Sequence, residues 1–551
     1  MDNTVESNDA VLTGSIKSAS YNMLLQIFFR AITFSMNGLV LHHVDKEVLG
    51  VINVRLMLLL MTILFISREA FRRACISNTR EHNWSKVVNL IWLTVPSVSI
   101  CSLLFCYIWL SWLELPSEKH VQDYQFAVKI FGVSCVIESF VEPVYIFSQA
   151  FLYIRWRLFV DLVMMFIRVG ILVGTVIYFP ECTIRTTAYG QLVVSTVLVV
   201  FYWAFFHFEF KKKAEIVKNR ELHRNDPLAL LPFSSLREFL PRNFFSPQGF
   251  DGQLANLTWA FFKQGLLKQL LTEGERYVMT VFSVLTFAEQ GVYDIVNNLG
   301  SMAARFIFLP IEESSYFYFA QKLSRNKPLK EHTSSDIKQI SDVLCKLLRA
   351  LILIGSIIVT FGLSYSHLLL RIYGGSTLID GPGPLLIKAH SFAVCLMAIN
   401  GVTEAYAFAA MSSSYLDRYN KLMVLLSFTF LFLSWMLSKI FGSIGFIIAN
   451  CCNMGLRIFH SLWFIRRHFQ DLPEKPLLGL LPNKAELLAL AAALAVTLWS
   501  QWFIYPYSII LHLVFGALSA ICVLGAILFT EPELREILFS FLREKFLRRN
   551  N

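Results

Sequence analysis

Apolar stretches of about twenty residues recur along nearly the whole chain, and short polar connections separate them. An α-helix needs about twenty consecutive apolar residues to cross a hydrocarbon core of ~30 Å. The pattern therefore predicts an all-α polytopic membrane protein with about fourteen transmembrane helices. The expected spans are 14–41, 48–67, 88–112, 124–150, 158–179, 187–208, 259–285, 290–318, 343–366, 384–411, 422–438, 444–465, 485–503 and 508–530.

The composition agrees with this class of protein. Only 16% of the 551 residues are charged, whereas a soluble domain carries roughly 25%. No soluble domain of any size fits between the apolar stretches. The first nine residues are acidic and no apolar run ends in a small-residue cleavage site, so we expect the first transmembrane helix to direct targeting.

Basic residues alternate between the two sets of connections, which predicts the orientation. One set, together with the C-terminal tail, holds thirty-one Lys and Arg residues, and the opposite set holds five. The basic set is expected on the cytoplasmic side, with both termini there. This asymmetry also explains the net charge of +10 without a nucleic-acid partner.

A hydrophilic stretch divides the chain into two halves that begin alike. Gly50-Val51 follows the first expected span, and Gly291-Val292 follows the seventh. Equivalent short segments suggest an internal repeat, in which two lobes of six helices surround a central charged cleft. The expected domains are 1–208 with helices one to six, 209–255 as a cytoplasmic interlobe linker, 256–468 with helices seven to twelve, 469–530 with the last two helices, and 531–551 as a basic amphipathic cytoplasmic tail.

Basic residues also occur within the expected spans. Each costs ~3 kcal/mol or more at the bilayer centre if it faces lipid, so each should face water, an acidic partner or another polar group. A wet cleft is the economical explanation. These residues are Lys17, Arg30, Arg55, Lys129, Arg168, Lys263, Lys268, Arg276, Arg305, Lys346, Arg349, Lys388 and Arg457.

Polar residues follow helical spacing on the helices expected to line that cleft. The cleft lining is predicted to comprise Asn22, Gln26, Asn37, Asp294 and Asn298. Arg30, Arg55 and Arg305 are favoured as substrate-facing, because a guanidinium fork suits phosphate oxygens. Gates or lobe-closing ion pairs are predicted at Glu69, Glu273, Arg276, Glu312 and Glu313.

A purely structural role is the alternative for the buried charges. In that case the basic residues pair within helix bundles, for example Asp161 with Arg168, one heptad apart on the fifth expected span. The other carboxylates available for pairing are Glu138, Glu142, Asp294, Glu312, Glu313 and Glu404.

Enzymatic chemistry finds no support in the sequence. No GxxxxGK[ST] loop is present, and the expected lumenal turns carry only isolated carboxylates. The histidines are scattered and the cysteines lie mostly in apolar runs, where thiols behave as small hydrophobes. We therefore expect neither catalysis, nor a metal, nor a cofactor.

Four segments resemble the eukaryotic Rft family. They are 68–75 (REAFRRAC), 268–276 (KQLLTEGER), 290–301 (QGVYDIVNNLGS) and 306–314 (FIFLPIEES). The resemblance implies a fourteen-helix fold like that of MATE and MurJ-like exporters, with an anionic, polyisoprenoid-linked substrate. In MurJ-like relatives, arginines on the first, second and eighth helices attract a lipid pyrophosphate. By position Arg30, Arg55 and Arg305 match, with Lys17, Lys263 and Lys268 as further candidates.

The resemblance also implies a function. The expectation is translocation of the dolichol-linked oligosaccharide Man5GlcNAc2 from the cytoplasmic to the lumenal leaflet of the endoplasmic reticulum membrane, during N-glycosylation. The partners that the resemblance implies are the glycolipid, the membrane itself and proteins of that pathway. Two alternatives stay open: a non-transporting accessory or scaffold protein of the same pathway, and a MATE-like small-molecule antiporter that uses its carboxylates for ions.

Overall fold

The fold is described from a computed structural model. It describes residues 38, 41–77, 82–151, 153–179, 183–218, 232–242, 249, 251–323, 329–532 and 535, and within these ranges the regular structure is helical, with no strand. The chain forms two compact units, residues 1–291 and 292–551.

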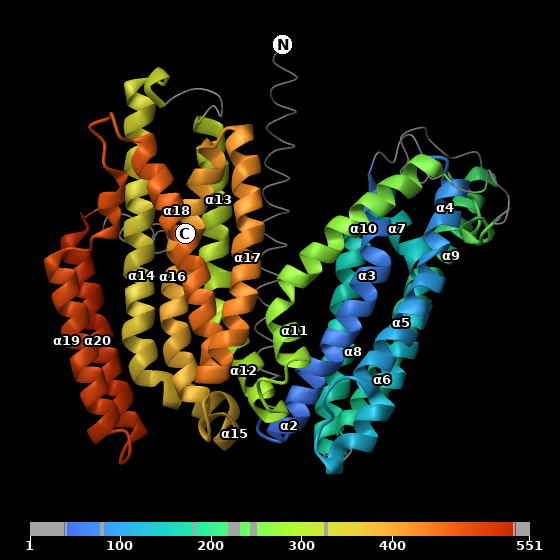
Figure 1. Ribbon diagram of the computed structural model, residues 1–551, viewed down its shortest axis with the longest axis horizontal. Helices are drawn as coiled ribbons and strands as arrows, with labels where there is room; N and C mark the ends of the chain where they lie inside the picture. Colours follow the sequence, from blue (N-terminus) through green and yellow to red (C-terminus); the bar gives the residue numbers. More distant parts are fainter. Residues whose placement is uncertain are drawn as a thin grey trace, which may run out of the picture. The chain divides into compact units, whose positions relative to one another are not determined.

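The first unit is built mainly on long helices (Figure 1). The second expected span lies in one continuous helix, Lys46–Ile76, in which Gly50–Leu56 are π-helical. The elements are α2 Lys46–Leu49, η1 Gly50–Leu56, α3 Met57–Ile76, α4 Trp84–Trp92, α5 Thr94–Ser111, α6 Glu118–Ser139, α7 Glu142–Ala150, α8 Ile154–Tyr178, α9 Thr183–Lys218, η5 Leu236–Phe239, α10 Gly252–Thr272 and α11 Gly274–Val281. The helix α12, Phe287–Gly300, crosses the boundary between the units.

Aromatic packing holds one end of the first unit together. Phe147 stacks on Phe233 at 5.2 Å between ring centroids and meets Phe239 edge-on at 4.9 Å. Both Phe233 and Phe239 are buried. Part of the expected interlobe linker therefore belongs to the core of this unit.

The second unit contains a bundle formed by α13, α14, α16, α17 and α18 (Figure 1). The paired helices α19 and α20 pack on α14. The elements after α12 are η6 Ala304–Phe308, α13 Leu309–Lys322, η7 Leu329–Glu331, α14 Ser334–Gly374, α15 Ser376–Ile379, α16 Gly383–Ala410, α17 Ser413–Phe441, α18 Ile444–His468, η8 Pro476–Leu480, α19 Lys484–Phe503 and α20 Ile509–Thr530.

Nine helices among the described residues are long and apolar enough to cross a membrane, or ten if α6 and α7, bent by 48°, form one span. The all-helical membrane fold is thus confirmed, and the number fourteen stays a prediction. Interruptions account for part of the difference. Helix α10 ends at Thr272, before α11, and a turn at Ser301 follows the end of α12.

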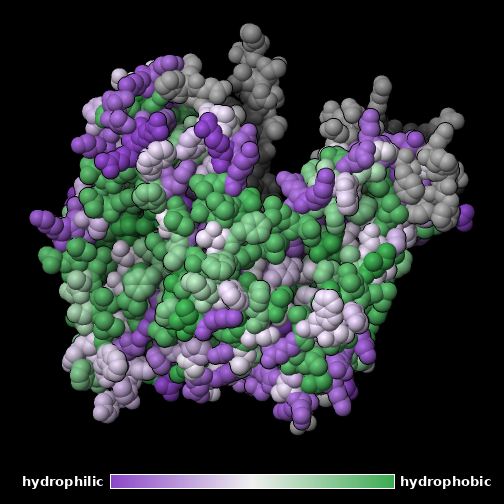
Figure 2. Space-filling model, viewed as in Figure 1, coloured by the Kyte–Doolittle hydropathy of each residue, from purple (hydrophilic) through white to green (hydrophobic). Residues whose placement is uncertain are grey.

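Several helices extend beyond their expected ends. Helix α3 continues to Ile76, so Arg68, Arg72 and Arg73 lie in a helix and not in a loop. The surface is consistent with a lipid environment, because large apolar side chains such as Leu103 and Phe459 are exposed. Figure 2 shows apolar side chains over the middle of the helices in each unit, with hydrophilic residues toward their ends.

Candidate functional site

Two of the arginines predicted to face the substrate lie in π-helical segments. Arg55 lies in η1 and Arg305 lies in η6. A π-helical turn inserts an extra residue into an α-helix, and such turns are frequent at functional sites. Each segment lies between two α-helices, η1 between α2 and α3, and η6 between α12 and α13.

Arg55 is fully enclosed in this structure. Its Nε donates to Gln290 Oε1 at 3.2 Å, and Nη1 donates to the carbonyl oxygen of Thr280 at 3.0 Å. The guanidinium also lies 4.7 Å from the centroid of the Phe287 ring. Nη2 is buried and has no hydrogen-bond partner among the described residues. In this conformation Arg55 is therefore held by polar groups of the first unit and is not open to solvent.

A close approach of two glycines supports this arrangement. A Cβ atom added at Gly291 would lie 2.7 Å from the backbone nitrogen of Gly50. One added at Gly50 would overlap the carbonyl oxygen of Phe287. The two Gly-Val segments that suggested a repeat thus meet each other, and only glycine allows the backbones this close.

Arg305 has a different setting, in the second unit. It is exposed, and its Nη2 donates to Asn298 Oδ1 at 3.3 Å. Asn298 Nδ2 in turn donates to Asp294 Oδ2 at 3.1 Å. The three residues predicted on one face of this helix are therefore connected by hydrogen bonds, as their spacing indicated.

The other described candidates are dispersed. Lys263 and Lys268 are exposed on α10, with no salt bridge to a carboxylate among the described residues. Three of the five predicted gate residues form local ion pairs: Glu69 with Arg73 at 2.8 Å, and Glu273 with Arg276 at 3.1 Å. Their proposed role in closing the lobes stays a prediction.

Five candidates lie outside the described residues: Lys17, Asn22, Gln26, Arg30 and Asn37. Arg55 and Arg305 belong to different units. A single wet chamber shared by Arg30, Arg55 and Arg305 thus stays a prediction.

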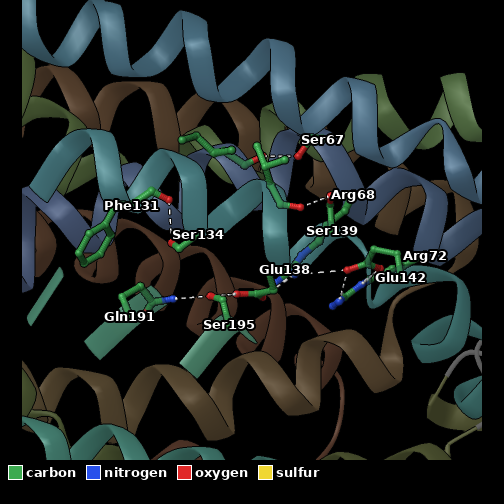
Figure 3. Close-up of polar contacts among 12 residues, drawn as sticks. Ser67, Arg68, Arg72, Phe131, Ser134, Glu138, Ser139, Glu142, Gln191 and Ser195 are labelled. Carbon is green, nitrogen blue, oxygen red and sulfur yellow. Dashed lines mark hydrogen bonds and ion pairs between the residues drawn. The ribbon is translucent and has the colours of Figure 1, made fainter. Parts of the chain in front are cut away.

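A charged cluster in the first unit joins α3 to the break between α6 and α7 (Figure 3). Glu142, fully buried, accepts from Arg72 Nε at 2.7 Å and Nη2 at 2.6 Å, and from Arg68 Nη1 at 3.3 Å. Arg68 Nη1 also donates to Glu138 Oε1 at 2.7 Å. Two arginines one turn apart on α3 thus match two carboxylates that flank the helix break.

The polar contacts continue from this cluster into α8 and α9. Ser195 Oγ donates to Glu138 Oε2 at 3.3 Å, Gln191 Nε2 donates to Ser195 Oγ at 3.3 Å, and Arg168 Nη2 donates to Gln191 Oε1 at 3.3 Å. The expected pairing of Asp161 with Arg168 is wrong. Asp161 instead pairs with Arg157, four residues earlier, at 3.6 Å.

A second charged cluster lies in the second unit. Arg457 on α18 forms a two-nitrogen contact with Glu404 on α16, and Tyr419 Oη donates to Glu404 Oε1 at 2.7 Å. Glu312 approaches the same helix, because a Cβ atom added at Gly401 would be 2.6 Å from its Oε2. The pairing interpretation holds for Arg457, whose charge serves helix packing here.

Sequence reasoning missed Gln290 as the partner of Arg55 and counted Arg68 and Arg72 with loop cations. A signal existed for the arginines: Arg68 and Arg72 are spaced i, i+4, and so are Glu138 and Glu142, which lie in an otherwise mostly apolar stretch. No such signal marks Gln290, because its contact with Arg55 joins residues 235 positions apart.

Comparison with known proteins decides the family. The Rft protein family matches residues 14–540 of this chain. The chain belongs to the Rft family. A relative from Xenopus tropicalis, named Man(5)GlcNAc(2)-PP-dolichol translocation protein RFT1, is 42% identical over 98% of this chain and 99% of its own length. The Mus musculus protein of the same name is 40% identical and covers 95% and 96% of the two chains.

Solved structures place the Rft chain in a transporter fold. The lipid II flippase MurJ, in an inward closed conformation, aligns with a TM-score of 0.57 at 13% identity, covering 94% of this chain and 99% of that one. An inward-facing MATE family multidrug resistance transporter of the MOP superfamily aligns with a TM-score of 0.53 at 10% identity, covering 80% and 96%. At such identities the likeness concerns the fold, and it confirms the expected MATE and MurJ-like architecture.

Proposed function

We propose that this chain translocates Man5GlcNAc2-PP-dolichol from the cytoplasmic to the lumenal leaflet of the endoplasmic reticulum membrane, with both of its own termini in the cytoplasm. The observation that carries the proposal is the 42% identity, over 98% of the chain, to a protein named for translocation of this lipid. A fold shared with a lipid flippase is consistent with it.

The physical problem is the head group. A pyrophosphate and many sugar hydroxyls cannot cross hydrocarbon without losing their hydration, which costs several kcal/mol for each unpaired polar group. A protein lowers this cost by offering cations and hydrogen bonds along the path, while the polyisoprenoid tail stays in lipid. No bound nucleotide is needed if the substrate is consumed in the lumen.

In the proposed mechanism the Arg305 guanidinium donates a hydrogen bond to a pyrophosphate oxygen of the substrate. Two observations support this role: Arg305 is exposed, and it lies in a π-helical segment. Arg55 would act later, after its contacts with Gln290 and Thr280 open, since its Nη2 already has no partner among the described residues. Arg30, Lys17, Lys263 and Lys268 are proposed to attract the phosphates, and Glu69, Glu273, Arg276, Glu312 and Glu313 to form the gates.

The test is translocation in vesicles that contain the purified full-length chain. A labelled Man5 lipid is scored for the leaflet that it occupies over time. Arg305→Gln should slow the transfer by roughly 10- to 100-fold, as expected for the loss of a charge-assisted hydrogen bond of ~1.5–3 kcal/mol. Arg418→Gln, an exposed cation of α17, is the control and should transfer at the wild-type rate. Equal rates in empty vesicles and vesicles with the protein would exclude direct translocation.

The accessory or scaffold role has one observation in its favour. Arg55, a predicted substrate ligand, is fully buried and bound by groups of its own chain. A scaffold requires no movement of these contacts. If Arg305→Gln supports normal glycosylation in cells, and vesicles show no transfer, the scaffold is the better description.

A further inference from the structure

We propose that the second unit binds the head group of an anionic phospholipid in a cavity at the end of α18. The cavity has a volume of about 990 Å³, at the upper end of the size of ligand pockets in proteins. We call it the α18 cavity and define it by Trp463, Arg466, Arg467, Gln470, Glu474 and Lys475, which line it.

The walls of the α18 cavity are formed by a chain segment that turns back from α18 toward α14. Ile465 and Phe469 are buried beneath it. On the far side, η8 lies on α14 so closely that a Cβ added at Gly479 would overlap the carbonyl oxygen of Cys345. The cavity is therefore held between fixed helices and is a stable feature of this unit.

The charges of the α18 cavity favour an anion. Arg466, Arg467 and Lys475 are exposed, and none forms a salt bridge with a carboxylate among the described residues. Glu474 is the one carboxylate among the residues that line the cavity. The neighbouring Asp471 forms a salt bridge with Lys330, with 2.8 Å between Oδ2 and Nζ. The residues that line the cavity thus include three cations and one carboxylate, and the excess positive charge can bind a phosphate.

The apolar surroundings favour a lipid over a soluble anion. Leu478 and Leu481, at and just after η8, are 54% and 64% exposed. Trp463 is 43% exposed, and the Arg467 guanidinium lies 5.4 Å from the centre of its ring. Basic residues beside exposed leucines and tryptophan are typical of the membrane interface, where the cations meet phosphates and the apolar side chains enter the acyl region.

The side of the membrane follows from the charge pattern. The connection between α18 and α19 belongs to the basic set of connections, which is expected in the cytoplasm. The cytoplasmic leaflet carries the anionic phospholipids, and each Lys or Arg near such a surface contributes to binding. Phosphatidylserine is therefore the probe of choice.

Binding should be measured with the purified full-length protein in detergent and a fluorescent short-chain phosphatidylserine. The triple variant Arg466→Gln, Arg467→Gln, Lys475→Gln should bind on the order of 100-fold more weakly than wild type, as expected for three interfacial cations. The matched control changes three exposed cations of the same basic set, Lys338→Gln, Arg418→Gln and Lys421→Gln, and should bind like wild type.

Equal losses in both triple variants would overturn the site and leave only diffuse attraction of charge. Displacement of the lipid by inorganic phosphate, at equal concentrations, would show an anion site without lipid selectivity and would also overturn the proposal. If the triple variant does not fold, the wild-type protein decides: a photo-crosslinking phosphatidylserine should label peptides of 463–478, and labelling elsewhere alone contradicts the site.

Discussion

Glu142 illustrates how single residues stabilise charge within this protein. It has no exposed surface and receives three hydrogen bonds from Arg68 and Arg72. Arg72 is further stacked against Tyr145, with its guanidinium carbon 4.0 Å from the ring centroid. A carboxylate that is buried so completely is tolerated only because its charge and its lone pairs are both satisfied.

Glu142→Gln should strongly destabilise the protein. The change leaves two arginines facing one remaining carboxylate, and breaking a buried ion pair typically costs ~3–5 kcal/mol. A clear drop in the midpoint of thermal unfolding in detergent is expected. Glu69→Gln is the control, because Glu69 pairs with Arg73 within one helix and is partly exposed, and such pairs contribute about 1 kcal/mol or less. Similar drops in the two variants would contradict this account.

Glu404 and Arg457 should behave as a coupled pair. Glu404→Gln and Arg457→Gln each leave the partner unpaired, and Glu404→Gln also weakens the bond from Tyr419. The double variant should lose less stability than the sum of the single variants, by about 1–3 kcal/mol. Thermal or denaturant unfolding of the four proteins measures this energy. Additive losses would mean that the contact does not stabilise the fold.

At the scale of helices, the breaks in the spans matter more than their lengths. The α6–α7 break carries Glu138 and Glu142 at its two sides, and the π-helical segments η1 and η6 carry Arg55 and Arg305. A π-helical turn changes the direction of the side chains that follow it. These interruptions therefore decide which polar groups meet inside each unit.

Gly50→Ala should disrupt the contact of η1 with the start of α12. The added Cβ would overlap the carbonyl oxygen of Phe287, a backbone atom that cannot move alone. We expect a poor yield of folded protein and a lower midpoint of thermal unfolding. Gly174→Ala is the matched control, since nothing lies within 4 Å of a Cβ placed there in α8. This control should be neutral or stabilised by up to ~1 kcal/mol, because alanine is the better helix former. The assignment fails if Gly50→Ala folds like Gly174→Ala.

At the scale of the molecule, the chain comprises two units, and the last two helices are fastened to the second. Arg349 on α14 lies 3.8 Å from Glu486 on α19 and 3.2 Å from Glu531 after α20. Glu486 is buried, caps the start of α19 and accepts from Thr530 at 2.7 Å. One arginine thus joins three helices.

Arg349→Gln should loosen α19 and α20 without unfolding the rest of the second unit. Hydrogen exchange should increase in 484–530 and stay at the wild-type level in α16. The double variant Arg349→Gln, Glu486→Gln should exchange at least as fast as Arg349→Gln alone, because Glu486 also caps the start of α19 and accepts from Thr530. Uniformly faster exchange across 292–532 would instead indicate general destabilisation.

How far the sequence predicts the fold and the candidate site depends on the distance over which each feature is encoded. The all-helical class follows from the length of the apolar stretches. The hydrogen bonds that connect Asp294, Asn298 and Arg305 follow from helical spacing. Both features are encoded locally in the sequence. The enclosure of Arg55 by Gln290 and Thr280 was not predictable, since it needs the approach of segments more than 200 positions apart.

The amino-acid sequence by itself determined that this chain is a helical membrane protein of the Rft family and which residues can carry charge within the membrane. Hydrocarbon excludes unpaired backbone polar groups, so long apolar stretches have little choice but to form helices. The tertiary structure alone decided which carboxylates are neutralised by partners, as at Glu142 and Glu404, and which cations are enclosed, as at Arg55. A pairing depends on the directions in which packed helices present their side chains, and those directions are set by breaks and π-helical turns whose effect appears only after the helices pack.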